Sequence, residues 1–189
     1  YYNREGSEVV LMKHRVPNKK KDDKFIWEAG GGKKDLWGLD NLDTSKPLVI
    51  TEGEIDAMSL TEAGIENVTS VPFGAEKYKW LENTWDVVDQ FEEIILWMDK
   101  DKPGQKTTET LIKRLGKWRC KVVTKSTHKD ANRVLFVEGE EAVREAVENA
   151  EELSINGLHQ MSDVEDWDPT EQEKILSSLD KVNQELRGY

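Results

Sequence analysis

Short apolar segments alternate with longer amphipathic segments through the middle of the chain. Apolar runs bounded by polar residues predict buried strands, which are 48–51, 68–71, 94–98 and 121–124. Helical periodicity, closing glycines and a proline near one helix start predict helices between the strands, at 54–63, 76–90 and 104–116. This alternation predicts an α/β fold with a parallel sheet covered by helices on both faces.

The two ends of the chain carry different patterns. Residues 8–27 alternate β-forming and polar residues around a polar turn, which predicts a hairpin. Residues 138–153 place valines and alanines on one face and predict a helix. Residues 154–169 have the composition of a linker, and 170–186 predict a last, acidic helix. We therefore expect three parts: a basic N-terminal subdomain at 1–46, an α/β domain at 47–153, and a linker with a helix at 154–189.

Carboxylates directly follow two of the predicted strands. Segment 48–56 reads Leu-Val-Ile-Thr-Glu-Gly-Glu-Ile-Asp, and segment 94–104 reads Ile-Ile-Leu-Trp-Met-Asp-Lys-Asp-Lys-Pro-Gly. Glu52 would stand at one strand end and Asp99 with Asp101 at the other, on the sheet edge where parallel α/β folds bind ligands. Three carboxylates gathered there repel each other unless a hard divalent cation neutralises them. The sequence therefore predicts a Mg²⁺ site, which Mn²⁺ would also fill.

Both acidic motifs also have a purely structural interpretation. Acidic residues at a helix start interact favourably with the helix dipole, which accounts for Glu54 and Asp56 but not for Glu52 followed by Gly53. Gly53 would permit a tight turn and the close approach of a ligand to the backbone. The Asp-x-Asp pair would also serve as a turn former before a proline. The two motifs at corresponding positions of one α/β pattern favour a functional site.

Further candidate residues lie in the segments around these motifs. Lys129-Asp-Ala-Asn132 follows the fourth predicted strand, so Asp130 would either reach the same sheet edge or cap a helix. Gly74, after the second strand, would allow a tight turn near the bound metal. Lys13 and Arg15 share one face of a hairpin strand that is rich in basic residues. That arrangement suits the binding of phosphate groups.

The net charge of -11 is distributed unevenly. Residues 1–48 hold 10 Lys and Arg against 8 Asp and Glu, residues 49–137 hold 13 against 15, and residues 138–189 hold 4 against 15. The acidity belongs to the C-terminal part, so the global charge does not exclude an anion-binding groove near the acidic motifs. The longest apolar run is only 94–98, and no membrane segment is expected. The single cysteine, Cys120, favours a reducing, cytoplasmic compartment.

The acidic motifs resemble those of the TOPRIM domain, which primases, topoisomerases and some nucleases share. The chain is most similar to the primase half of bacteriophage primase–helicases, over residues 1–150. The likeness rests on Glu52-Gly-Glu-Ile-Asp56, Asp99-x-Asp-x-x-Gly104 and Lys129-Asp-Ala-Asn132, and it extends to Lys13-His-Arg15, Lys24-Phe25 and Leu36-Trp-Gly38. It implies a TOPRIM-type parallel sheet, preceded by a small mixed α/β subdomain and followed by an acidic helix.

The resemblance also implies a reaction, which is the template-directed synthesis of short RNA primers on single-stranded DNA from ribonucleoside triphosphates. Glu52, Asp99 and Asp101 would bind the catalytic metal, with Asp130 as a supplementary ligand. Contacts to nucleotide or DNA would come from Lys13, Arg15, Lys24, Gly53, Gly74 and Lys129.

The resemblance extends to the organisation of the parent protein. The chain lacks an initiator Met, and its last residues are similar to the run into a ring helicase domain, so we expect a fragment of a primase fused to a helicase. Phage proteins of this kind often carry an N-terminal zinc-binding domain, which a chain with one cysteine cannot contain. Sequence-specific initiation is therefore not predicted for the fragment.

Two other functions would use the same residues. A TOPRIM nuclease would employ the same carboxylates with water as the nucleophile, and only its products would distinguish it; the basic hairpin favours the primase. A DNA-binding module of a helicase, without polymerase activity, would have no need to keep these acids together. A topoisomerase is the least favoured, because no strand-cleaving domain fits within 189 residues.

Overall fold

The computed structural model describes residues 9, 11–15, 25–29, 35–72 and 78–153. The chain divides into two compact units, 1–153 and 154–189. The second unit, with its predicted acidic helix, lies outside the described residues, as do Lys24 and Gly74. The strands are β1 (Leu11–Arg15), β2 (Phe25–Ala29), β3 (Leu48–Thr51), β4 (Val68–Ser70), β5 (Ile94–Trp97), β6 (Cys120–Val122) and β7 (Glu151–Glu152). The helices are α1 (Glu54–Glu62), α2 (Lys79–Val88), α3 (Lys102–Leu115), α4 (Ala131–Glu138) and α5 (Glu140–Glu148), with short 3-10 turns η2 (Leu39–Asn41) and η3 (Lys117–Arg119).

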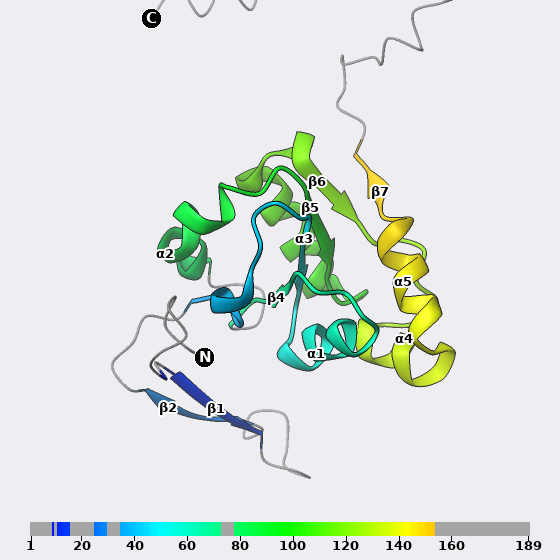
Figure 1. The fold of residues 1–189 in the computed structure, drawn as a ribbon, viewed down its shortest axis with the longest axis horizontal. Helices are drawn as coiled ribbons and strands as arrows, with labels where there is room; N and C mark the ends of the chain where they lie inside the picture. Colours follow the sequence, from blue (N-terminus) through cyan, green and yellow to red (C-terminus); the bar gives the residue numbers. More distant parts are fainter. Residues whose placement is uncertain (1–8, 10, 16–24, 30–34, 73–77, 154–189) are drawn as a thin grey trace, which may run out of the picture. The chain divides into compact units, whose positions relative to one another are not determined.

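A five-stranded sheet in the order β4-β3-β5-β6-β7 forms the centre of the first unit (Figure 1). Strands β4, β3, β5 and β6 are parallel, which confirms the predicted α/β architecture. Strand β7 is the exception, because it pairs with β6 in the antiparallel sense. The sequence placed Glu151–Glu152 in a helix, and that assignment is wrong. Glu152 instead pairs opposite Lys121, whose Nζ lies 3.6 Å from a Glu152 carboxylate oxygen.

The predicted helix at 138–153 is in fact the shorter helix α5, preceded by a separate helix, α4. Gly139 separates the two with a φ of 90°, a left-handed conformation that favours glycine and ends the helical path. Asp130 is the N-cap residue before helix α4, and its carboxylate accepts a hydrogen bond from the Arg133 N–H at 2.8 Å. The structural interpretation of Asp130 as a helix cap is therefore confirmed.

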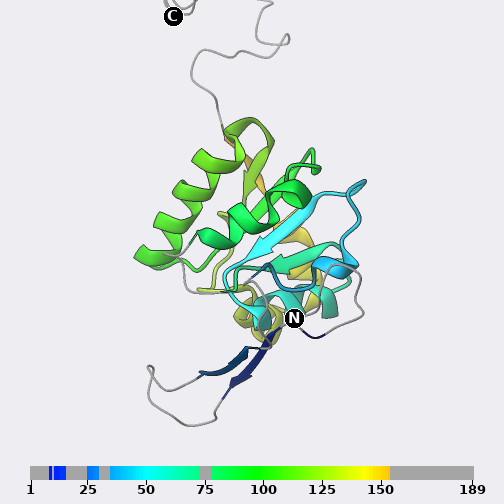
Figure 2. The same cartoon turned by 90° about the vertical axis from the view of Figure 1, so that its left-hand side faces the viewer.

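Helices cover both faces of the sheet (Figures 1 and 2). Successive strand residues point to opposite faces. In β3, Leu48 and Ile50 pack in one apolar cluster with residues of α2 and α3, and Val49 packs in a second cluster with residues of α1, α4 and α5. The sheet is thus buried on both sides, as the continuous apolar runs predict. Within the described part of the chain, no helix is long and apolar enough to cross a membrane.

Strands β1 and β2 pair in the antiparallel sense, with Leu11 opposite Ala29 and Arg15 opposite Phe25. This confirms the hairpin predicted at the N-terminal end of the chain. Lys13 and Arg15 both belong to β1. The side chain of Arg15 lies outside the described part of the structure.

Candidate metal and active site

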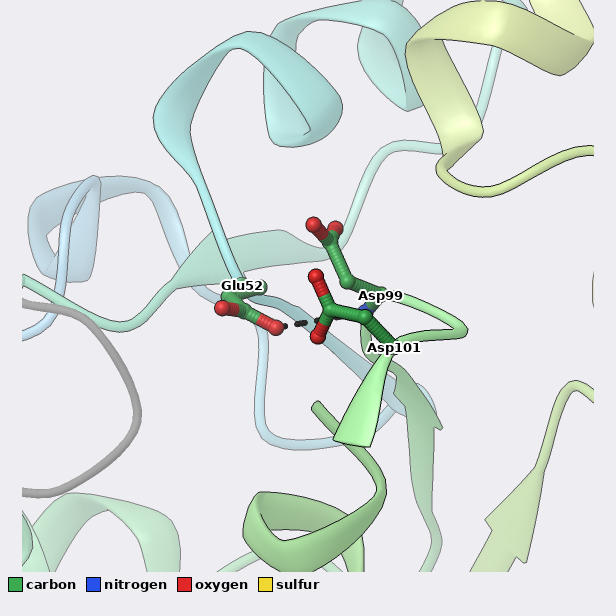
Figure 3. A group of neighbouring side chains, drawn as sticks. All are labelled: Glu52, Asp99 and Asp101. Carbon is green, nitrogen blue, oxygen red and sulfur yellow. Dashed lines mark hydrogen bonds between the residues drawn. The ribbon is translucent and has the colours of Figure 1, made fainter. Parts of the chain in front are cut away.

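Strands β3 and β5 are direct neighbours in the sheet, with Thr51 opposite Trp97. Glu52 follows β3 and Asp99 follows β5 by one further residue, so both emerge at the same edge of the sheet. Carboxylate oxygens of Glu52, Asp99 and Asp101 all lie within 4.8 Å of one another. Figure 3 shows these side chains converging beyond the strand ends. The structure therefore brings together the three residues that the sequence suggested as metal ligands.

Backbone hydrogen bonds hold two of these carboxylates in place. The Asp99 N–H donates to Glu52 Oε2 at 3.3 Å, and the Gly104 N–H donates to Asp101 Oδ1 at 3.0 Å. Burial raises the pKa of Glu52, and the negative charges of Asp99 and Asp101 raise it further. A set of carboxylate oxygens under mutual repulsion fits a hard divalent cation, because such a cation prefers oxygen ligands and relieves the repulsion.

Gly104 is a site residue whose function the sequence did not reveal. It lies in the first turn of α3, and a Cβ atom placed on it would lie 2.1 Å from the Asp99 carbonyl oxygen. Only a glycine lets the helix pack this closely on the loop that carries Asp99 and Asp101. The signal in the sequence was the Asp-x-Asp-x-x-Gly spacing, in which the glycine marks a close approach between two backbone segments.

Lys129 lies against two of the three carboxylates. Its Nζ is 2.7 Å from Asp99 Oδ2 and 3.1 Å from Asp101 Oδ2. Hydrogen bonds to these carboxylates raise the pKa of Lys129 above its usual range, so the side chain stays positively charged at neutral pH. The suggested contact of Lys129 with nucleotide or DNA stays a prediction. In the structure its positive charge is paired with Asp99 and Asp101.

The segment that carries Lys129 is attached to the β5–α3 loop through Lys100. The Lys100 N–H donates to the Lys129 carbonyl oxygen at 2.9 Å. The Lys100 ammonium group donates to the Ser126 carbonyl oxygen. The two loops are therefore linked by both lysines. Lys100 of the β5–α3 loop binds the backbone oxygens of Ser126 and Lys129. Lys129 in turn binds Asp99 and Asp101, the two acids that flank Lys100.

A fourth acid, Asp56, lies close to this site, although the sequence assigned it only to the helix dipole. Its carboxylate accepts a hydrogen bond from the Asn132 N–H at 3.0 Å. Burial raises the pKa of Asp56 to about 6, and the charges of Asp130 and Asp99 also raise it. Asp130 is outside the group of three acids that meet within 4.8 Å, so its role as a supplementary ligand stays a prediction. The available signal was the spacing of Asp56, four residues after Glu52.

The structure gives local roles to Lys13 and Gly53, which the sequence suggested as contacts for nucleotide or DNA. Lys13 Nζ lies 2.7 Å and 2.6 Å from the two carboxylate oxygens of Glu54, so it joins the hairpin to the first turn of α1. Gly53 precedes α1 with an extended φ of -136°, which any residue adopts. A Cβ atom there would lie 3.2 Å from Asp56 Oδ2, so Gly53 leaves room for the acid rather than providing an unusual turn. Phosphate binding by Lys13 stays a prediction.

The raised pKa of Asp56 predicts a specific dependence of stability on pH. Its folded value of about 6 exceeds the ordinary 3.8, so the folded state holds more protons between these values and gains stability as the pH falls through 6. We expect Asp56→Asn, in the presence of EDTA, to raise the free energy of unfolding by about 2–3 kcal/mol at pH 8. Near pH 4 the variant and the wild type should be equally stable. Urea unfolding across this range is the measurement, and a difference that is constant with pH would contradict the prediction.

Comparisons with known proteins identify the family of the chain. A Toprim-like family profile matches residues 49–135. The chain is 35% identical over 177 residues to the Twinkle homolog protein, chloroplastic/mitochondrial, of Arabidopsis thaliana, covering 82% of this chain and 24% of that protein. It is 32% identical over 154 residues to the DNA helicase/primase of Enterobacteria phage T3, covering 79% and 26%. The chain thus spans about a quarter of the length of these curated relatives.

A solved structure shows the same fold. The primase fragment of the bacteriophage T7 primase-helicase protein superposes with a TM-score of 0.66 at 30% identity, covering 78% of this chain and 60% of that chain. The matched family region contains Glu52, Asp99, Asp101 and Asp130. Fold, acidic motifs and relatives agree with the resemblance seen in the sequence. The chain belongs to the TOPRIM-domain primases, together with the primase half of bacteriophage primase–helicases.

Proposed function

We propose that this chain is the catalytic core of a DNA primase, which synthesises short RNA primers on a single-stranded DNA template. The observation that carries the proposal is the group formed by Glu52, Asp99 and Asp101, whose carboxylate oxygens lie within 4.8 Å of one another at the edge of a TOPRIM sheet. Nucleotidyl transfer needs a place where the charge of a triphosphate is neutralised, and a divalent metal held by these three carboxylates would provide one.

In the proposed reaction the primer 3′-hydroxyl oxygen attacks the α-phosphorus of an incoming ribonucleoside triphosphate. A P–O bond forms to the primer, the bond to the β-phosphate oxygen breaks, and pyrophosphate leaves. Mg²⁺ held by Glu52, Asp99 and Asp101 would neutralise the triphosphate and acidify the 3′-hydroxyl. Alternatively, Glu52 would act as the general base that accepts the proton of that hydroxyl.

The proposed partners follow from the same site. The template is single-stranded DNA, the substrates are ribonucleoside triphosphates, and a ring helicase domain would belong to the same parent protein. The name of the phage T3 relative combines helicase and primase, which supports such a fusion. We also propose a cytoplasmic location, since a sequence with a single cysteine, Cys120, is typical of a reducing compartment.

A primer-synthesis assay tests the proposed function. The chain is mixed with single-stranded DNA of random sequence, labelled ribonucleotides and either Mg²⁺ or Mn²⁺, and the products are separated by length. We expect short oligoribonucleotides that are absent when EDTA is added. Metal-dependent shortening of the DNA would show a TOPRIM nuclease instead. DNA binding without any product would support a binding module that serves the helicase.

A further inference from the structure

We infer that the Lys129 ammonium group competes with the divalent cation for Asp99 and Asp101, and so sets the metal affinity of the site. This inference rests on the proposed function, because it takes Glu52, Asp99 and Asp101 as the metal ligands. It adds a control on metal binding that is part of the same chain.

Lys129 contacts two of the three acids that would hold the metal. Its Nζ lies 2.7 Å from Asp99 Oδ2 and 3.1 Å from Asp101 Oδ2, so one ammonium group bridges both acids. Mg²⁺ requires oxygen ligands at about 2.0–2.1 Å in a nearly octahedral arrangement. A cation coordinated by these oxygens and an ammonium group bonded to the same atoms would be close neighbours of like charge. Binding of one therefore disfavours binding of the other.

The charges at the site lead to the same conclusion. Lys129 brings a positive charge to the group of three carboxylates, through its contacts with Asp99 and Asp101. The lysine lowers the mutual repulsion of the acids, which also lowers the electrostatic gain that a metal would obtain there. Removal of the lysine should therefore leave a site that is less stable without metal and binds metal more tightly.

The way Lys129 is attached allows it to leave the acids without unfolding the loop. Its backbone is held by the Lys100 N–H, which donates to the Lys129 carbonyl oxygen at 2.9 Å. Its side chain is 54% exposed, whereas that of Asp99 is 18% exposed. The ammonium group can therefore turn toward solvent while the carboxylates keep their positions. The expected behaviour is an exchange of cations on a fixed acidic group, which involves no larger rearrangement.

Metal affinity measured on the whole chain tests the inference. Wild type, Lys129→Met and Lys129→Gln are titrated with Mn²⁺ at fixed ionic strength, without nucleotide or DNA, and free Mn²⁺ is followed by electron paramagnetic resonance. Both variants should bind Mn²⁺ on the order of 5- to 100-fold more tightly than wild type. In EDTA, both variants should have a lower melting temperature than the wild type. Saturating Mn²⁺ should raise their melting temperatures by more than it raises that of the wild type, because a ligand that binds more tightly stabilises the folded state more.

Lys102→Met is the matched control. Lys102 is exposed and follows Asp101 directly, so its removal takes one positive charge from the same region without touching the Lys129 contacts. We expect its effect on Mn²⁺ affinity to be much smaller. Unchanged or weaker binding by the Lys129 variants would overturn the inference, and so would an equal gain in Lys102→Met. If the Lys129 variants bind Mn²⁺ more tightly but the wild type makes no primers, only the proposed function is refuted. If the wild type makes primers but the variants bind Mn²⁺ with unchanged affinity, only the inference is refuted.

Discussion

Asp99→Asn is expected to lower metal-dependent primer synthesis by about 10³-fold while leaving the chain folded. Metal ions contribute several kcal/mol of charge stabilisation in the transition state, and about 1.4 kcal/mol corresponds to a factor of ten in rate. Asparagine has the shape of aspartate but lacks the charge that binds the cation. The Asp99 carboxylate also contacts Lys129, and the Asp99 N–H donates to Glu52, so the substitution changes an acid that is linked to two other residues of the site.

The measurement is the yield of labelled oligoribonucleotides over a range of Mg²⁺ concentrations. Glu109→Gln is the matched control, since Glu109 is an exposed acid on α3 that lies outside the acidic group. It should retain wild-type activity. Circular dichroism melting should show both variants folded, with midpoints within a few degrees of the wild type. Full activity of Asp99→Asn would show that the acidic group does not carry the reaction.

Gly104→Ala is expected to damage both stability and activity, although the change adds only one methyl group. The new Cβ would meet the Asp99 carbonyl oxygen at 2.1 Å, and this oxygen is backbone that cannot turn away. Helix α3 and the Asp99 loop must therefore separate. Overpacking of this kind costs about 1–3 kcal/mol. A shift of about 1 Å in catalytic groups lowers rates by about 10²-fold.

Urea unfolding and the primer-synthesis assay measure the two effects. Gln105→Ala is the control at the next position of α3, where the side chain is exposed and alanine is a good helix former. That variant should be as stable as the wild type or slightly more stable. If Gly104→Ala raised the stability, as glycine to alanine often does inside a helix, the result would contradict the close contact between α3 and the Asp99 backbone.

The local pattern of the sequence determined most of the secondary structure. The four parallel strands and helices α1, α2 and α3 lie close to their predicted ranges. The strands follow from runs of apolar residues, and the helices from periodicity, closing glycines and a proline near one helix start. The same local pattern placed Glu52 and Asp99 just beyond strand ends. Carboxyl ends of parallel strands lie on one edge of a sheet, so the sequence predicted that Glu52, Asp99 and Asp101 share an edge. The pairing of β3 with β5, which the sequence pattern does not give, brings their carboxylate oxygens within 4.8 Å of one another.

Local pattern failed where residues distant in sequence decide the structure. Glu151–Glu152 has helical neighbours, but it pairs with β6, a strand about thirty residues earlier in the chain. The partner of Lys13 is Glu54, and that of Asp56 is the backbone of Asn132. None of these contacts leaves a periodic signal, because each depends on how separate elements pack.

The sequence by itself therefore determined the α/β architecture, the acidic edge and the membership of the TOPRIM primases. Only the tertiary structure decided which charges meet there. It placed Lys129 on Asp99 and Asp101 and gave Asp56 a raised pKa. It also made Gly104 the point where α3 approaches the Asp99 backbone. The physical reason is that strands and helices follow from short-range burial patterns, whereas ion pairs and pKa values depend on distances between side chains that only the packed fold fixes.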